Sequence, residues 1–224
     1  QFVVALTCGV MCALGAFLYR SARMGVGLAL AFGLGTLALP YSRFYFNEPL
    51  TALGFGVAIW GALGYRRLGK ARWLLMSGVG LGLAVLTRTV SALLIPPFLA
   101  YLWPLNTNNP QLGRSSHSLI KIRLNRAIVF LLPVAALGAV QVAYQWWAFG
   151  APLSGGYQGE GWQTPIWLGL YGLLLSPGKS LLLFTPLSLL SAWGWLRWRR
   201  EGWGREALFS VACFLFWLLF HAGW

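Results

Sequence analysis

Three basic residues have the type and the spacing to bind an anion together. Arg43 lies in the segment PYSRFYFNEP, Arg88 at the centre of a long apolar run, and Lys179 in the segment LLSPGKSLL. Guanidinium and ammonium groups both match the geometry of phosphate oxygens, and the peptide N–H groups that lead into Ser180 would add donors at a helix start. The pattern favours one phosphate site shared by these residues. The alternative is that each cation extends separately to lipid headgroups.

One of the four acidic residues, Glu48, stands where a helix is expected to start. It precedes Pro49, which suits the first turn of a helix, and the helix dipole favours a carboxylate at that end. Spacing leaves three roles open: an ion pair with Arg43, a divalent-cation site shared with Asn47, or a hydrogen bond to a sugar hydroxyl. Asn47 and Glu48 alone would make a poor cation site, because calcium and magnesium need more oxygen ligands.

The other reactive side chains predict no metal cluster and no catalytic nucleophile. His117 and His221 fall on opposite sides of the expected membrane, so they cannot share a metal ion. The three cysteines, Cys8, Cys12 and Cys213, are an odd set inside apolar runs, which fits neither a disulfide framework nor a zinc motif. We therefore predict no bound metal and no cofactor, apart from the open question of a divalent cation.

Composition identifies the surroundings in which these residues must work. Of the 224 residues, 58% are hydrophobic and only 9% are charged, whereas a soluble domain carries about 25% charged residues. The mean hydropathy is +0.67. The formal net charge of +13 comes from basic residues in short loops between apolar runs, which is typical of membrane topology signals rather than of a nucleic-acid surface. These numbers predict a polytopic membrane protein and exclude an ordinary soluble enzyme.

The apolar runs predict an all-α bundle of about eight membrane segments, since a spanning helix needs about 20 apolar residues. Six segments are expected at 1–19, 25–42, 49–64, 127–148, 180–197 and 207–224. The run 73–104 is too long for one span and carries Arg88 near its middle. We predict that it forms a short hairpin, which supplies the remaining two segments and has Arg88 at its apex.

The distribution of charge supports the hairpin. With it, fourteen of the seventeen basic residues lie on one side of the membrane, and that side is expected to face the cytoplasm. Arg43, Arg88 and Lys179 are the three that remain on the outer side. The segment 163–176 is too short to span and is predicted to lie on the outer leaflet as an interfacial helix.

We interpret residues 1–224 as a single transmembrane domain that is a fragment of a longer protein, truncated at both ends. The chain starts with Gln1, and both of its ends fall inside apolar stretches.

Three motifs occur here in a fixed order. They are PYSRFYFNEPL at the start of a span, GVGLGLAVLTRTVSALLIPPFLAYL, and YGLLLSPGKSLLLFTPLSLL followed by a basic turn. In this order and topology, the chain resembles bacterial membrane glycosyltransferases of the C-type fold, in particular the protein O-mannosyltransferase and aminoarabinose-transferase group. The resemblance covers nearly the whole chain.

The resemblance implies transfer of a sugar from a polyprenyl-phosphate carrier to an acceptor at the outer face of the cell (inner) membrane. It implies that Glu48 lies at the active site, that Arg88 faces the same cavity, and that Lys179 contacts the carrier phosphate. The general base of the family lies in a large outer loop near the N-terminus, and this chain contains no such loop. An alternative is a non-enzymatic transporter or flippase that uses the same cations to bind an anionic lipid-linked substrate.

Overall fold

The computed structural model describes residues 1–43, 46–103, 116–152, 161–178 and 180–224, with the backbone alone for 116–123. The described residues are helical and contain no strand. In chain order the helices are α1 (Phe2–Tyr19), α2 (Ala22–Gly35), α3 (Ala38–Tyr41), α4 (Glu48–Leu68), α5 (Ala71–Thr87), η1 (Thr89–Leu94), α6 (Ile95–Leu102), α7 (Ser116–Phe149), α8 (Ile166–Leu174), α9 (Leu181–Phe184), η3 (Pro186–Ser188), α10 (Leu189–Arg200) and α11 (Gly204–Gly223). This confirms the predicted all-α fold class.

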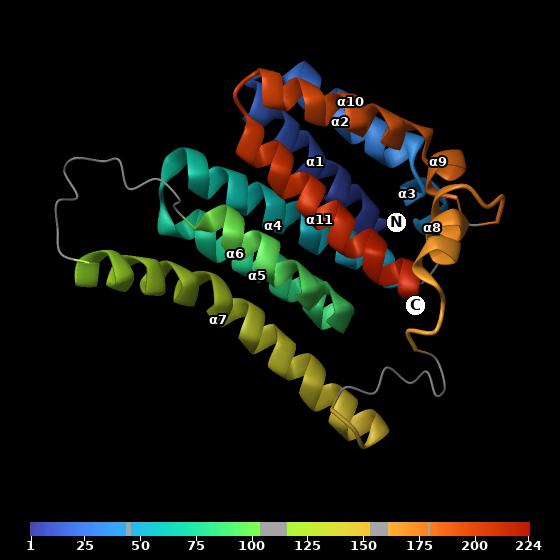
Figure 1. Cartoon of the computed structure of the whole chain (residues 1–224). Helices are drawn as coiled ribbons and strands as arrows, with labels where there is room; N and C mark the ends of the chain where they lie inside the picture. The colour runs from blue at the N-terminus through green and yellow to red at the C-terminus, as the bar shows by residue number, and fades with distance from the viewer. Residues whose placement is uncertain (44–45, 104–115, 153–160, 179) are drawn as a thin grey trace.

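The turns gather at two opposite ends of the bundle, as Figure 1 shows. We call the end that holds α3, α8, α9 and both chain termini the outer end. The inner end holds the tight turns after α1, α4 and α10, at Arg20, Gly69 and Gly202. All three of these residues have a positive φ, a backbone region that Gly occupies without steric cost. Most of the basic residues that were expected to face the cytoplasm stand in or beside these inner turns.

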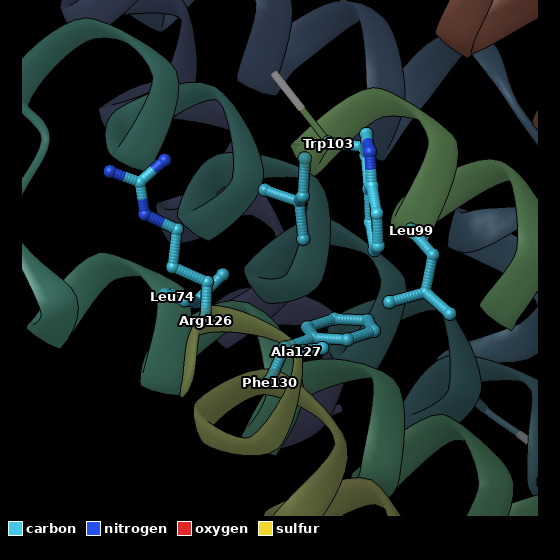
Figure 2. A pocket seen from close by; sticks show the side chains of 7 residues that line it. Leu74, Leu99, Trp103, Arg126, Ala127 and Phe130 are labelled. Carbon is cyan, nitrogen blue, oxygen red and sulfur yellow. The ribbon is translucent and has the colours of Figure 1, made fainter. Parts of the chain in front are cut away.

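The run 73–104 reverses its direction within the bundle. α5 ends at Thr87, Arg88 is extended with φ −145° and ψ 108°, and η1 and α6 follow. Leu74 from the start of α5 and Leu102 from the end of α6 line one small cavity together with Phe130 of α7, and Figure 2 shows the α5, α6 and α7 side chains around it. At about 20 Å³, the cavity has room for about one water molecule. The cavity is therefore a packing gap. Because the start of α5 and the end of α6 both line it, it shows that the chain returns to the end of the bundle at which α5 began.

Two predicted spans are wrong as single helices. The segment 25–42 is divided into α2 and α3 by an extended residue, Thr36 (φ −131°, ψ 178°). The segment 180–197 is divided into α9, η3 and α10 at Thr185 (φ −139°, ψ 68°). Pro186 explains the second break, because a residue before proline is held away from the helical region and proline itself donates no N–H.

Three of the described helices are long and apolar enough to cross a membrane: Phe2–Tyr19, Leu124–Phe149 and Gly204–Gly223. Shorter apolar helices cover 22–35, 71–87 and 89–102. These findings support a membrane protein with transmembrane helices. The predicted interfacial segment 163–176 contains α8, which packs against the outer end of α11, and the N–H of Thr164 donates to the carbonyl of Gly223 at 3.3 Å.

The most extensive pairing among the described helices is that of α4 with α5, and small residues make it possible. A Cβ atom added at Gly61 would lie 2.4 Å from the backbone nitrogen of Ser77, and one added at Gly80 would lie 2.4 Å from that of Ala58. The buried Ser77 hydroxyl donates to the carbonyl of Ala58 at 2.8 Å. Small residues that allow close approach, joined by an interhelical hydrogen bond, are characteristic of packing inside membranes. This pairing fixes the outer ends of α4 and α5 beside each other.

Arg67 joins three helices at the inner end, and its replacement is a test of that junction. Its guanidinium lies 4.4 Å from the ring centre of Trp203 and 5.1 Å from that of Phe17, and it donates to the Phe17 carbonyl at 2.8 Å. We expect Arg67→Ala to lower the free energy of unfolding by about 1 kcal/mol, at the low end for such contacts because the side chain is exposed. The thermal midpoint in detergent measures this change.

Arg67→Lys should recover part of the loss, because it keeps the charge and loses the planar set of donors. Arg23→Ala is the matched control, since Arg23 is exposed on α2 and has no side-chain partner among the described residues. Equal midpoints for Arg67→Ala and Arg23→Ala would contradict the role assigned to Arg67.

Candidate functional site

The outer ends of α4 and α5 carry a polar group of five residues that we call the apex cluster: Asn47, Glu48, Thr51, Thr87 and Arg88. The Arg88 Nη2 atom lies 3.8 Å from Glu48 Oε1. The Asn47 amide donates to the Thr87 carbonyl at 3.2 Å, and the hydroxyls of Thr51 and Thr87 are 2.9 Å apart. The close α4–α5 packing thus brings together residues that are 40 positions apart in the sequence.

Glu48 pairs with Arg88, and among the described residues no ion pair joins it to Arg43. Its Oε2 atom is shielded from solvent and has no hydrogen-bond donor in that part of the chain. Both side chains of the pair are about a third exposed, at 36% and 37%. A long, partly exposed ion pair contributes only about 0–1 kcal/mol. The pair is therefore weak, and a ligand can compete for either member.

Arg88 keeps most of its donors for other partners. A guanidinium carries five N–H donors, and within the described ranges the Arg88 side chain contacts Glu48 through one nitrogen. α11, which carries His221, packs against η1 beside Arg88. His221 itself bonds through Nδ1 to the Trp217 carbonyl at 2.9 Å. Sequence reasoning only excluded a metal pair of His221 with His117, and it did not foresee that α11 packs beside the hairpin apex.

A cavity of about 290 Å³ opens beside the apex cluster, between α1, α2, α3, α4 and the residue that precedes η3. Its polar lining consists of Thr7, Thr36, Tyr41, Glu48 and Thr185, and the rest of its lining is apolar. Thr36 and Thr185 are the two residues at which predicted spans are broken. The backbone changes direction at these two residues, and the cavity lies beside them.

The structure describes two of the three remaining sequence candidates, Arg43 and Ser180. Arg43 follows α3, its backbone N–H donates to the Pro40 carbonyl at 3.1 Å, and its side chain is exposed. Ser180 is 1% exposed; its hydroxyl donates to the Leu174 carbonyl and accepts from the Leu183 N–H at 3.1 Å. Lys179 lies outside the described residues. The structure thus brings Asn47, Glu48 and Arg88 together.

The predicted anion seat at Ser180 is weaker than the sequence indicated. Ser180 caps α9, which has four residues, and not the long span that was expected to start there. A four-residue helix has few aligned peptides to add to its dipole, and the Ser180 hydroxyl is already committed to two partners. The contribution of this residue is to fix the turn between α8 and α9.

Sequence reasoning missed a second polar group next to the hairpin apex, on α7 and η1. Gln145 is 6% exposed and donates to the Thr89 hydroxyl at 3.2 Å. The Ser91 hydroxyl and the Gln145 Oε1 atom are both buried without a partner in the described part of the chain. Gln145 is the one buried residue in an otherwise exposed aromatic stretch, 144–149. In the sequence, a single polar residue within this stretch was the signal that could have indicated the polar group.

No group of three His, Cys, Asp or Glu side chains that could hold a metal ion occurs among the described residues. Asn47 donates to Thr87 through its Nδ2 atom and Glu48 pairs with Arg88 through Oε1. These contacts leave the Asn47 Oδ1 and Glu48 Oε2 atoms as oxygen ligands, fewer than calcium or magnesium needs. The divalent-cation role of Glu48 stays a prediction.

Comparisons of the chain with protein-family models, with curated proteins and with solved structures each found no match. The resemblance to membrane glycosyltransferases therefore stays a prediction that rests on the three sequence motifs, and the fold rests on the geometry described above.

Proposed function

We propose that the chain belongs to a membrane glycosyltransferase that takes a sugar from a polyprenyl-phosphate carrier at the outer face of the cell membrane. The observation that carries the proposal is the weak Glu48–Arg88 pair, which lies beside a cavity whose mostly apolar lining includes four hydroxyl side chains. The pair has a cation suited to a phosphate on one side and a carboxylate suited to sugar hydroxyls on the other. The three sequence motifs, two of which contain Glu48 and Arg88, support the same chemistry.

The proposed reaction exchanges one bond at the anomeric carbon. An acceptor hydroxyl oxygen forms a bond to that carbon while the bond to the phosphate oxygen breaks, and the lipid phosphate leaves with the electron pair. Arg88, with Arg43 and Lys179, would stabilise the charge that grows on the phosphate. Glu48, assisted by Asn47, would orient the sugar. The proton of the acceptor goes to a base that the family resemblance assigns to an outer loop.

Transfer is tested with purified full-length protein in vesicles of phosphatidylethanolamine and phosphatidylglycerol. The donor is a polyprenyl-phosphate hexose labelled in the sugar, and the readout is the label on an acceptor together with the released lipid phosphate. Label that crosses the vesicle membrane while it is still attached to the carrier would instead support the transporter or flippase reading. Label that neither transfers nor crosses would contradict the proposal for that class of donor.

The proposal also includes about eight membrane segments, with the outer end of the bundle facing away from the cytoplasm. We expect a single cysteine at Ala151 to react with a membrane-impermeant maleimide in intact spheroplasts, and one at Arg200 to react only after lysis. Both positions are exposed at opposite ends of the bundle. The background replaces Cys8, Cys12 and Cys213 by alanine. The reverse labelling pattern would contradict the assigned orientation.

A further inference from the structure

Arg88 stands between two threonines, and each of them is held by a different helix. On one side, the Thr87 hydroxyl lies 2.9 Å from the Thr51 hydroxyl of α4. On the other side, the Thr89 hydroxyl accepts a hydrogen bond from the Gln145 amide of α7 at 3.2 Å. The Arg88 backbone is extended between the end of α5 and the start of η1. The direction of its side chain therefore depends on how both neighbours are anchored.

The backbone at Arg88 is the joint between two helical segments. Its N–H donates to the Ala84 carbonyl of α5 at 2.9 Å, and its carbonyl accepts from the Ser91 N–H of η1 at 2.9 Å. The two backbone dihedrals of this single extended residue set the relative direction of the segments on either side. Contacts with α4 anchor the α5 side of the joint, and the bond from Gln145 anchors the η1 side.

The bond between Gln145 and Thr89 lies where polar atoms are costly. Gln145 is 6% exposed and Ser91 is fully buried. The Gln145 Oε1 atom and the Ser91 hydroxyl have no hydrogen-bond partner in the described part of the chain, and a buried polar atom left unpaired costs about 1–3 kcal/mol. An apolar side chain would fill this place at a lower cost, which points to a role other than stability.

α7 does not need this bond in order to stay attached to the bundle. It already packs closely against α5, where a Cβ atom added at Gly82 would lie 2.8 Å from the Pro133 carbonyl oxygen and 2.9 Å from a methyl carbon of Leu137. Gln145 lies eight residues after Leu137, which is about 12 Å further along the helix towards the outer end. Different parts of α7 therefore attach the helix and anchor η1.

We propose that Gln145 is a positioning residue for sugar transfer, which acts through Thr89 to hold the hairpin apex so that the Arg88 guanidinium faces the carrier phosphate. The inference deepens the proposed function and rests on it for the presence of the phosphate. It adds α7 to the elements that build the site, since the apex cluster comes from α4 and the junction of α5 with η1. A misplacement of about 1 Å can cost about 10²-fold in rate, so the loss of this bond should lower kcat although Gln145 touches no substrate.

The test removes the bond in two backgrounds. Gln145→Met keeps a side chain of similar length without its donors, and we expect it to lower kcat for transfer about tenfold in the full-length protein. In the Arg88→Ala background the same change should have no further effect, because Gln145 acts through Arg88. An equal loss in both backgrounds would show that the bond only joins two helices, and would overturn the proposal. An unchanged kcat for Gln145→Met would also overturn it.

Gln141→Met is the matched control. Gln141 lies one turn earlier on α7, is half-buried and has no hydrogen-bond partner in the described ranges, so its replacement should leave kcat unchanged. The thermal midpoint of Gln145→Met should change little, because the substitution also removes an unpaired buried oxygen. If Gln145→Met fails to fold, Thr89→Val removes the same bond from the η1 side and should give the same loss of kcat.

The two proposals can fail separately, because binding of the carrier phosphate is measured without transfer. Isothermal calorimetry with farnesyl phosphate, on the full-length protein in lipid nanodiscs, gives that affinity. In a protein that transfers no labelled sugar, an affinity that Gln145→Met lowers about threefold or more, and only while Arg88 is present, would support the positioning role and contradict the transferase. Transfer at full rate in Gln145→Met would contradict the positioning role and leave the transferase. No transfer together with unchanged phosphate binding would contradict both.

Discussion

Arg88→Ala is expected to lower the rate of sugar transfer about 10²–10³-fold, the usual cost of removing one donor that stabilises charge in a transition state. Arg88 is extended at the apex between α5 and η1, where close helix packing holds it beside Glu48. Because the phosphate gains charge as the bond to the sugar breaks, the contact strengthens in the transition state. The loss should therefore fall mainly on kcat, with a smaller change in KM. Initial rates over a range of donor concentrations separate the two.

Three further variants sharpen this test. Arg88→Lys should recover part of the rate, because it restores the charge but not the paired donors that match phosphate oxygens. Lys179→Ala should reduce transfer in the same direction. Arg23→Ala, an exposed arginine on α2, controls for the loss of one positive charge and should leave the rate unchanged. Full turnover in both Arg88→Ala and Lys179→Ala would show that these cations do not hold the carrier phosphate.

Gly61→Leu is expected to reduce the yield of folded protein severely, and Gly61→Ala to lower the free energy of unfolding by about 1–3 kcal/mol, the usual cost of overpacking. An added Cβ would lie 2.4 Å from the Ser77 nitrogen and 2.8 Å from the Trp73 carbonyl oxygen. These are backbone atoms, which cannot rotate away as the end of a side chain can. α4 and α5 must therefore separate, and the apex cluster would separate with them. Thermal unfolding in detergent measures the stability.

Gly27→Ala and Gly27→Leu are the matched controls, because Gly27 lies in the interior of α2 with open space around its Cβ position. Alanine favours a helix over glycine by about 1 kcal/mol, so Gly27→Ala should leave the midpoint unchanged or raise it. A midpoint for Gly61→Ala equal to that of Gly27→Ala would mean that the α4–α5 contact is looser than described.

The reversal of the chain at Arg88 could be predicted from the sequence, because membrane topology follows the number of basic residues on each side of the membrane. A segment that crossed once would have divided the basic residues almost evenly and left Arg88 inside the bilayer, which is costly. The prediction needed no knowledge of packing. The start of α4 was predictable for a similar reason, because Glu48 and Pro49 are local signals for the first turn of a helix.

The partner of Glu48 could not be predicted in the same way. Spacing offered an ion pair with Arg43, five residues earlier in the sequence, as one of three roles, whereas the structure pairs Glu48 with Arg88, forty residues later. The pairing follows from the close contact at Gly61 and Gly80, and only three-dimensional packing determines which residues such a contact aligns. The same reason applies to the hydrogen bond between Gln145 and Thr89.

The helix breaks were partly visible in the sequence. Pro186 was a direct signal against a continuous helix through 180–197. The prediction of one span there rested on the hydropathy of the segment and ignored the proline. The break at Thr36 follows Gly33 and Gly35, which weaken a helix but do not end it by themselves. Since Thr36 and Thr185 both line the cavity, missing the breaks also meant missing the cavity.

The two helix breaks have a consequence for the thickness of the surrounding bilayer. They lie together, because a Cβ atom added at Gly35 would lie 2.4 Å from a methyl carbon of Leu187. With 14 and 12 residues, α2 and α10 rise about 21 Å and 18 Å, against a hydrocarbon core of about 30 Å. Lipids accommodate such short helices by thinning locally. The headgroups nearest the cavity would then sit deeper than elsewhere.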